Sequence, residues 1–392
     1  VLNRSASAEY VFIGSTDGYL YAFNALGCAG NLQCGPVWQS AYLGTITASS
    51  PAVADEVING VQTSVVYVLG DPCCSGTQFY TQLYAINAAN GSAIWHTDVG
   101  PQEADSSPNV VGAVVYVLGG VFSQGVLAID ATNGNLLWTG PPIVTPYPSP
   151  AVANGDVYTP SDRGVLSAFD ANGCNQLSCS PLWTGHAGGT YLQESPAVAN
   201  AVVNGNQNPV VYIGSYDGYL YAFDANGIIN CTNHICQPLW IGNGAGEVSS
   251  PAVAPPAGAA TNGVVYVGGG GNNLVAFDAN GVINCTIVNG TQTCQPLWMG
   301  TTGGIIYSSP AIANGVVYVG SSDGYLYAFD AAGIQGCSGM PKVCNPISTF
   351  YTDDRGQSSP AVSGGLVYVG STDGYLYALQ PPPACAYSPP YC

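Results

Sequence analysis

Basic side chains are almost absent from this sequence. Four Lys and Arg stand against 22 Asp and Glu in 392 residues, and the formal net charge at pH 7 is −18. Binding to nucleic acid or to an anionic membrane surface needs a basic patch. The basic residues are scattered along the whole chain, at Arg4, Arg163, Lys342 and Arg355. We therefore expect no nucleic-acid partner.

Long apolar runs are also missing. No stretch approaches the roughly 18 apolar residues of a membrane-spanning helix. The residues after Val1 do not form the basic region and apolar run of a signal peptide. Nevertheless, 47% of the residues are hydrophobic and 26 are Tyr, which is enough to form a large core. The sequence thus predicts a folded protein without a membrane span.

One sequence pattern recurs along the whole chain. Its clearest copy starts at Tyr307 and reads YSSPAIANGVVYVGSSDGYLYAFDAAG. Self-similarity at a period of 20 to 50 residues is typical of repeat architectures. Related copies start at Ser49, Ser106, Ser149, Ser195, Ser249 and Ser358, and a more diverged eighth copy starts at Leu2.

Each copy is expected to form short antiparallel β-strands. The runs SPAVA, VVYVG and YLYAFD are followed in most copies by a fourth run around PLW. An Asp-Gly pair, typical of a β-hairpin turn, joins the second and third runs at Asp17, Asp217, Asp323 and Asp373. Four strands per repeat predict an all-β, eight-bladed β-propeller. We expect one domain over residues 1–380 and a Pro/Cys-rich tail over residues 381–392.

The last blade is expected to lack its outermost strand. Six fourth runs centre on a Trp, namely Trp38, Trp95, Trp138, Trp183, Trp240 and Trp298. In the seventh copy we assign this position to Phe350. After Leu379 the eighth copy continues as QPPPACAYSPPYC, and Pro cannot donate to a strand ladder. We therefore expect 31 of the 32 strands of a complete propeller, with an unpaired edge on blade 8.

The cysteines are expected to form disulfides. Six pairs lie close in the sequence: Cys28 and Cys34, Cys174 and Cys179, Cys231 and Cys236, Cys285 and Cys294, Cys337 and Cys344, and Cys385 and Cys392. Five of these pairs fall between the third and fourth runs, where they would staple long hairpin loops. Zinc sites are disfavoured because the spacings vary and no Cys-x-x-Cys pair occurs. Disulfides indicate an oxidising, extracellular location.

The adjacent Cys73 and Cys74 allow two interpretations. They would form a strained vicinal disulfide or reach separate partners. The vicinal bond is favoured because every other cysteine has a close mate, and a structural role in pinning its loop is favoured over a cofactor contact.

Five Asn-x-Ser/Thr sequons are expected in exposed termini and hairpin loops, where they would carry N-glycans. They lie at Asn3, Asn90, Asn230, Asn284 and Asn289.

The repeat resembles the quinoprotein-type (PQQ-like) propeller repeat over nearly the entire chain. That family includes quinone-dependent dehydrogenases and cofactor-free scaffold propellers such as the bacterial outer-membrane assembly lipoprotein. The dehydrogenases would imply PQQ with calcium, and a vicinal disulfide against the cofactor makes Cys73 and Cys74 the weak cofactor-binding candidates. The family's contiguous ligand motifs are not visible, and few cations are present to hold a carboxylated quinone. The resemblance therefore favours the scaffold members and no cofactor.

No catalytic or metal-binding residue is predicted. His96, His186 and His234 each lack a nucleophile motif around them. Three carboxylates, Glu103, Glu194 and Glu247, precede first strands and could converge near one mouth of the central channel. A solvated acidic rim is favoured over a cation site there.

We expect a secreted or cell-surface, glycosylated structural or assembly protein without catalytic activity. Its partners would be other copies of itself or cell-surface proteins and glycans. The incomplete blade edge would allow it to polymerise into a filament through strand addition. The alternative is a PQQ-dependent dehydrogenase of the periplasm or cell surface.

Overall fold

The structure is a computed structural model, and its described residues are entirely β-strands, turns and loops. These residues are 2–5, 8–28, 33–47, 49–72, 80–101, 106–119, 125–142, 148–161, 163–188, 192–245, 249–254, 263–269, 271–353 and 358–381. Among them, no helix has the length and apolar character that a membrane span requires.

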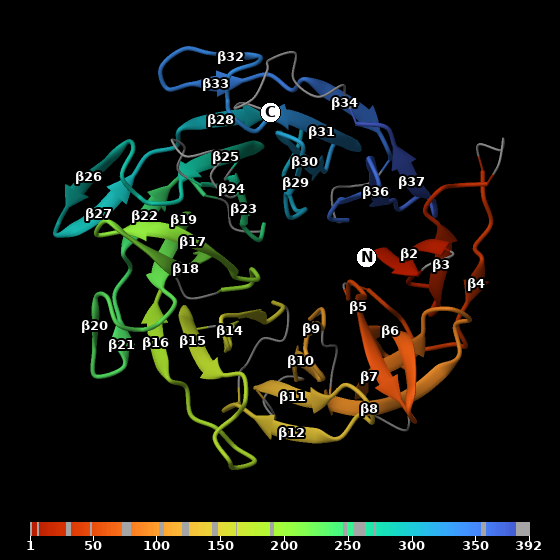
Figure 1. Cartoon of the computed structure of the whole chain (residues 1–392). Coiled ribbons are helices and arrows are strands. Elements are labelled where there is room, and N and C mark those ends of the chain that lie inside the picture. Colours follow the sequence, from red (N-terminus) through yellow and green to blue (C-terminus); the bar gives the residue numbers. More distant parts are fainter. Residues whose placement is uncertain are drawn as a thin grey trace. The chain divides into compact units, whose positions relative to one another are not determined.

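The chain divides into two compact units. One comprises residues 1–162 and 168–182, and the other comprises residues 163–167 and 183–392, so the division runs through the fourth blade. The prediction of one domain over residues 1–380 stays a prediction. Figure 1 labels most of the strands of both units.

The first unit holds blades 1 to 3 and the first half of blade 4. Blade 1 is β1 (Leu2–Ser5), β2 (Ala8–Gly14), β3 (Leu20–Asn24) and β4 (Trp38–Gln39). Blade 2 is β5 (Ala52–Ile58), β6 (Val61–Gly70), β7 (Tyr80–Asn87) and β8 (Ala93–Pro101). Blade 3 is β9 (Asn109–Val111), β10 (Val114–Leu118), β11 (Val126–Asp130) and β12 (Leu136–Thr139). Blade 4 is β13 (Ala151–Ala153), β14 (Asp156–Pro160), β15 (Val165–Asp170) and β16 (Trp183–His186).

The second unit holds the rest of blade 4 and blades 5 to 8. Blade 5 is β17 (Ala197–Val203), β18 (Asn206–Gly214), β19 (Tyr219–Asp224) and β22 (Trp240–Asn243). Blade 6 is β23 (Ala252–Ala254), β24 (Val264–Gly269), β25 (Asn273–Asp278) and β28 (Trp298–Thr301). Blade 7 is β29 (Ala311–Ala313), β30 (Val316–Ser321), β31 (Tyr325–Asp330) and β34 (Ser348–Tyr351). Blade 8 is β35 (Ala361–Ser363), β36 (Leu366–Gly370) and β37 (Leu376–Leu379).

The predicted all-β, eight-bladed propeller is confirmed, and so is the incomplete last blade. Blades 1 to 7 contribute four antiparallel strands each, and the described residues of blade 8 form three, in the order β35-β36-β37. First strands of successive blades touch within each unit, β5 with β9 and β9 with β13, and likewise along β17, β23, β29 and β35. We call the first strand of a blade inner and the fourth outer.

Neighbouring blades pack through the second and third strands. In β30 every residue from Val316 to Ser321 is buried, because the blade is covered on both faces. A cluster between blades 6 and 7 joins Tyr266 and Leu274 to Val317 and Phe329. Burial leaves the tyrosine hydroxyls in need of acceptors. Four of these hydroxyls donate to a turn of the next blade over 2.8 to 2.9 Å: Tyr67 to Ala131 O, Tyr116 to Ala171 O, Tyr212 to Ala279 O and Tyr266 to Ala331 O.

Six short strands lie outside this blade scheme. They form three two-stranded hairpins, which we call the arms: β20 (Cys231–Thr232) with β21 (Ile235–Cys236), β26 (Cys285–Val288) with β27 (Thr291–Cys294), and β32 (Cys337–Ser338) with β33 (Val343–Cys344). We predicted long hairpin loops at these positions, so their strand pairing is an addition to the sequence analysis.

Candidate functional site

The open outer edge of blade 8 is the candidate functional site. β37 pairs with β36 from Val367↔Leu379 to Gly370↔Leu376, and no described residue forms a strand on its other side. The missing strand leaves an alanine of β37 uncovered. Ala378 is exposed, whereas the equivalent Ala328 of blade 7 has 0% of its surface accessible.

The main-chain groups of Ala378 face the open side. In blade 7 the equivalent carbonyl, Ala328 O, accepts from Ile347 N of the outer segment at 2.8 Å. In an antiparallel ladder the N–H and C=O of one residue point to the same side. Ala378 therefore presents both a donor and an acceptor to an incoming strand, without giving up a bond to β36.

An outer strand normally brings a tryptophan to the next blade. The indole lies opposite the alanine of the third strand, as in Ala276↔Trp298. It donates a hydrogen bond to the turn after the third strand of the following blade. The Nε1 atoms donate over 3.0 to 3.3 Å from Trp38 to Ala88 O, from Trp95 to Ala131 O, from Trp138 to Ala171 O and from Trp183 to Ala225 O.

The receiving turn needs glycine. Gly333 has φ +62°, and a Cβ added there would lie 2.2 Å from Cδ1 of Trp298. Only glycine combines this backbone region with room for the indole. Gly27 of blade 1 has φ +74° in the corresponding turn, yet nothing lies within 4 Å of the same added atom.

The assignment of Phe350 to the tryptophan position is wrong. The register pairs Ala328 with Ser348, and Phe350 lies two residues further along, opposite Leu326. Pro346 aligns with the Pro of the PLW runs, which would have identified the correct position. We assigned Phe350 instead because it is the nearest aromatic residue. In the sequence of blade 8, Pro381 and Pro383 stand where blade 7 has Ala331 and Gly333, so the glycine of the receiving turn is missing.

The three arms extend the preceding blades. β21 pairs in parallel with β16, β27 with β22 and β33 with β28, so each arm lies on the outer strand of the blade before its own. A shorter contact of the same kind joins Thr139 to Ser178, next to Cys179. These arms cover outer edges that would otherwise expose unpaired backbone groups.

The described part of the chain contains five disulfides, which confirms the prediction of disulfide bonds. They join Cys28 to Cys34, Cys174 to Cys179, Cys231 to Cys236, Cys285 to Cys294 and Cys337 to Cys344. In each of the three arms the two cysteines face each other in the strand register, so the bond closes the hairpin. Cys73, Cys74, Cys385 and Cys392 lie outside the described residues.

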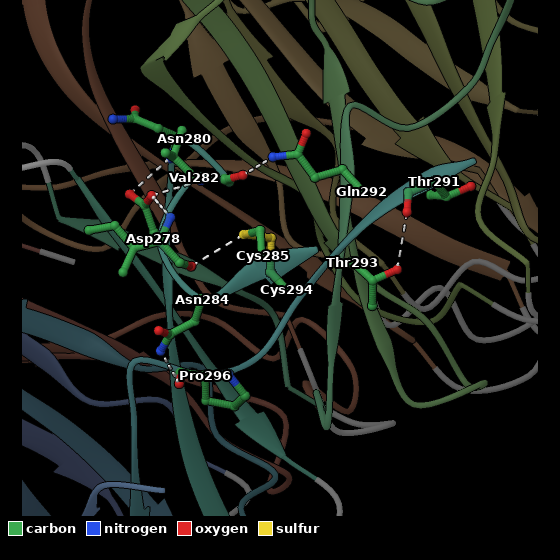
Figure 2. Close-up of a disulfide and its surroundings, with 12 residues drawn as sticks. Asp278, Asn280, Val282, Asn284, Cys285, Thr291, Gln292, Thr293, Cys294 and Pro296 are labelled. Atoms are coloured by element: carbon green, nitrogen blue, oxygen red, sulfur yellow. Dashed lines mark hydrogen bonds between the residues drawn. A yellow bond between two sulfur atoms is a disulfide. The ribbon is translucent and has the colours of Figure 1, made fainter. Parts of the chain in front are cut away.

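Figure 2 shows how the blade 6 arm is anchored around Cys285 and Cys294. Asp278 Oδ2 accepts from Val282 N at 2.9 Å, which fixes the start of the arm. Asn284 Nδ2 donates to Pro296 O at 3.1 Å. The arm is therefore held by the same aspartate turn that ends the third strand.

Four of the predicted sequons have exposed asparagines in turns or at arm ends, and the fifth, Asn3, lies on β1. Asn230 and Asn284 are equivalent, because each Nδ2 donates to a Pro carbonyl of its own blade, over 3.2 and 3.1 Å. The other two are Asn90 and Asn289. Attachment of a glycan to any of them stays a prediction.

The repeated aspartates serve their hairpin turns, as expected from the repeat. Asp17, Asp217, Asp323 and Asp373 each accept from the N–H of the Tyr two residues on, over 2.9 to 3.2 Å. Each also accepts from the hydroxyl of the Tyr four residues on, over 2.5 to 2.7 Å.

Two buried carboxyls were not anticipated. Glu194, 8% exposed, accepts from Ser250 Oγ at 3.4 Å, and burial raises the pKa of its carboxyl to about 8. Glu56, 6% exposed, has a buried Oε1 without a hydrogen-bond partner. Burial first, and then the charges of Asp130 and Asp55, raise the pKa of Glu56. Their burial comes from neighbouring blades, which the local sequence does not reveal.

The expectation that the chain binds neither PQQ nor calcium stays a prediction. No group of three or more His, Cys, Asp or Glu side chains among them could hold a metal ion. Lys342, a potential partner for a carboxylated quinone, donates Nζ to Gly333 O at 3.0 Å in the blade 7 arm. Glu103 and Glu247, predicted near Glu194, lie outside the described residues. We derive no step through this cofactor.

These features define an eight-bladed PQQ-like β-propeller with one incomplete blade. The chain belongs to the family described as outer membrane protein assembly factor BamB, whose model matches residues 16–228 and 238–382.

Solved structures of similar fold include both scaffold and enzyme propellers. BamB from Moraxella catarrhalis is 17% identical, with a TM-score of 0.63, covering 99% of this chain and 95% of that chain. Quinohemoprotein alcohol dehydrogenase from Comamonas testosteroni is 14% identical, with a TM-score of 0.56, covering 94% and 69%. At these identities the likeness shows the fold alone.

One curated relative is a tetrathionate hydrolase from Acidithiobacillus ferrooxidans. It is 25% identical over an alignment of 277 positions, which covers 61% of this chain. The chain matches about half of that relative's length, 49%.

Proposed function

We propose that this protein is an extracytoplasmic structural or assembly propeller that polymerises by strand addition at blade 8. The observation that carries the proposal is the open edge of β37, where Ala378 is exposed and its equivalents are buried. An unpaired strand edge is a template for pairing with another chain. A head-to-tail contact of this kind that does not close produces a filament.

Membership in the assembly-factor family supports a role in holding proteins together. The five disulfides support an oxidising location, outside the cell or in a periplasm. The exposed sequons Asn230 and Asn284 support glycosylation at the arms. Partners would be other copies of the chain, with cell-surface proteins and glycans around them.

Electron microscopy of the untagged protein from its native source tests the proposal. Regular filaments with propellers in contact along the axis are expected. Isolated particles would contradict polymerisation and direct attention to the alternative, a PQQ-dependent dehydrogenase, which dye reduction with added PQQ and calcium would test.

A matched pair of variants tests the role of the edge. Ala378→Pro removes the N–H that faces the open side but leaves the bonds to β36, since Pro is tolerated on edge strands. Ala378→Ser keeps that N–H and serves as the control. We expect filaments from the wild type and Ala378→Ser, and none from Ala378→Pro. Unchanged filaments from the Pro variant would show that assembly uses another surface.

A further inference from the structure

A cluster of exposed tyrosines joins blades 7 and 8 on the side of the Asp-Gly turns. Tyr325 and Tyr351 meet edge to face, with ring centroids 5.2 Å apart. Thr372 Oγ1 of blade 8 donates to Asp353 O of blade 7 at 3.0 Å, which brings the turn holding Asp373 and Tyr375 beside them. We call Tyr325, Tyr351, Asp353, Asp373 and Tyr375 the aromatic-acidic patch.

The patch offers large ring surfaces to solvent. Tyr351 is 60% exposed, Tyr375 is 55% exposed and Tyr325 is 39% exposed. Large side chains of a folded protein are usually better covered than this, and a gathering of exposed aromatics marks interaction surfaces.

The carboxylates of the patch lie against the tyrosines and have no basic partner among the described residues. Tyr351 Oη donates to Asp353 Oδ1 at 2.9 Å. Tyr375 N donates to Asp373 Oδ1 at 2.9 Å. The hydrogen bond to Asp353, with the charges of Asp353 and Asp373, raises the pKa of Tyr351. The phenol therefore stays protonated and keeps its hydrogen bond to Asp353.

Aromatic faces beside carboxylates suit a cation. A Lys ammonium or Arg guanidinium is attracted to a ring face within about 6 Å of its centroid. The carboxylates add electrostatic complementarity, which favours association with a basic surface. A second copy of this chain is a poor source of such a group, because its 392 residues contain only four Lys and Arg.

We propose that the aromatic-acidic patch of blades 7 and 8 docks a Lys- or Arg-bearing segment of a different protein. The inference is independent of polymerisation, because it uses exposed side chains and leaves the backbone edge of β37 free. It gives the propeller a basic partner in addition to copies of itself.

The test measures fluorescence anisotropy of a fluorescein-labelled peptide of six Lys-Ser repeats with the full chain at low salt. Tyr351→Ala combined with Tyr375→Ala is expected to weaken binding about five- to tenfold, since each exposed ring contributes a modest cation–π attraction. Tyr351→Phe keeps the ring and is expected to keep most of the affinity. The variants change exposed side chains, and circular dichroism verifies that they remain folded.

A charge-matched control separates the patch from the overall negative charge of −18. Asp373→Asn and Asp217→Asn remove the same charge and the same hydrogen bond to a tyrosine hydroxyl, in blades 8 and 5. Asp373→Asn is expected to weaken binding, and Asp217→Asn to leave it within about twofold.

Equal effects of these two variants, or an unchanged affinity of the double Tyr variant, would overturn the proposal. No binding of the Lys-Ser peptide would do the same. A neutral probe, maltohexaose, provides the remaining arm: binding that depends on the two tyrosines but not on salt would assign the patch to glycans and overturn a cationic partner.

Discussion

Two glycines in corresponding turns allow the tryptophan contact between blades to be measured. Gly91 and Gly27 both have φ +74°. A Cβ added at Gly91 would lie 2.6 Å from Cε3 of Trp38, whereas one added at Gly27 would meet nothing within 4 Å. Gly91→Ala and Gly27→Ala therefore impose the same backbone strain and differ in whether an indole is present.

The expected energies follow from these distances. An alanine in the left-handed region costs about 1 to 2 kcal/mol in either variant. At Gly91 the added methyl must displace the Trp38 ring, because ordinary carbon contacts are about 3.5 to 4.0 Å. Overpacking costs about 1 to 3 kcal/mol. Loss of the bond from Trp38 Nε1 to Ala88 O adds about 1 kcal/mol. Gly91→Ala should thus destabilise the protein by about 2 to 4 kcal/mol more than Gly27→Ala.

Guanidinium denaturation of both variants, followed by tryptophan fluorescence, gives this difference from the unfolding midpoints at an unchanged slope. Native-state hydrogen exchange shows where the protein is destabilised, because only Gly91→Ala should expose the amides of β4. Free energies of unfolding that agree to within about 0.5 kcal/mol between the two variants would refute the reasoning, since the indole contact would then contribute nothing beyond the strain of the turn.

Three further variants test other features. Replacing Cys285 and Cys294 by Ser should destabilise the arm by about 3 kcal/mol in the chain-entropy model. Hydrogen exchange in β22 should become faster, and unchanged exchange there would contradict the parallel pairing of β27 with β22. Glu194→Gln should stabilise the protein at pH 8 but not at pH 4. The pKa of Glu194 is about 8 in the folded state and lower in the unfolded chain, so the stability of the native protein falls as the pH rises between these two values, by about 5 kcal/mol at most. Thermal melts between pH 4 and pH 8 measure this dependence of stability on pH. An equal effect of Glu194→Gln at both pH values would contradict the raised pKa. Ser348→Trp should give no stability gain within about 0.5 kcal/mol, because blade 8 lacks the glycine of the receiving turn, and a higher melting temperature would argue against this.

The repeat could be predicted because each blade carries its strand pattern and turn chemistry locally. Val-Val-Tyr runs and Asp-Gly turns specify β18, β30 and their partners without reference to the rest of the chain. The same locality made the missing outer strand visible, since blade 8 has Pro where the other blades have a strand.

The arms could not be predicted as strands. Cys231–Thr232 and Ile235–Cys236 are too short for a periodic signal, and their parallel pairing with β16 joins segments about 50 residues apart. The tryptophan position of blade 7 was misassigned for a related reason. The register is set by strand pairing with β31, and the nearest aromatic residue gives no information about it.

In the polymer proposed above, the treatment of outer edges would set the number of neighbours of one chain. The arms occupy the outer strands of blades 4, 5 and 6, β4 is only two residues long, and the pairing of β8 with β7 is irregular at two positions. Short or bulged edges are poor templates for another strand. Few open edges would favour linear growth of the proposed polymer, whereas many would favour branching. Removing the arms would therefore shift the proposed filament towards a network.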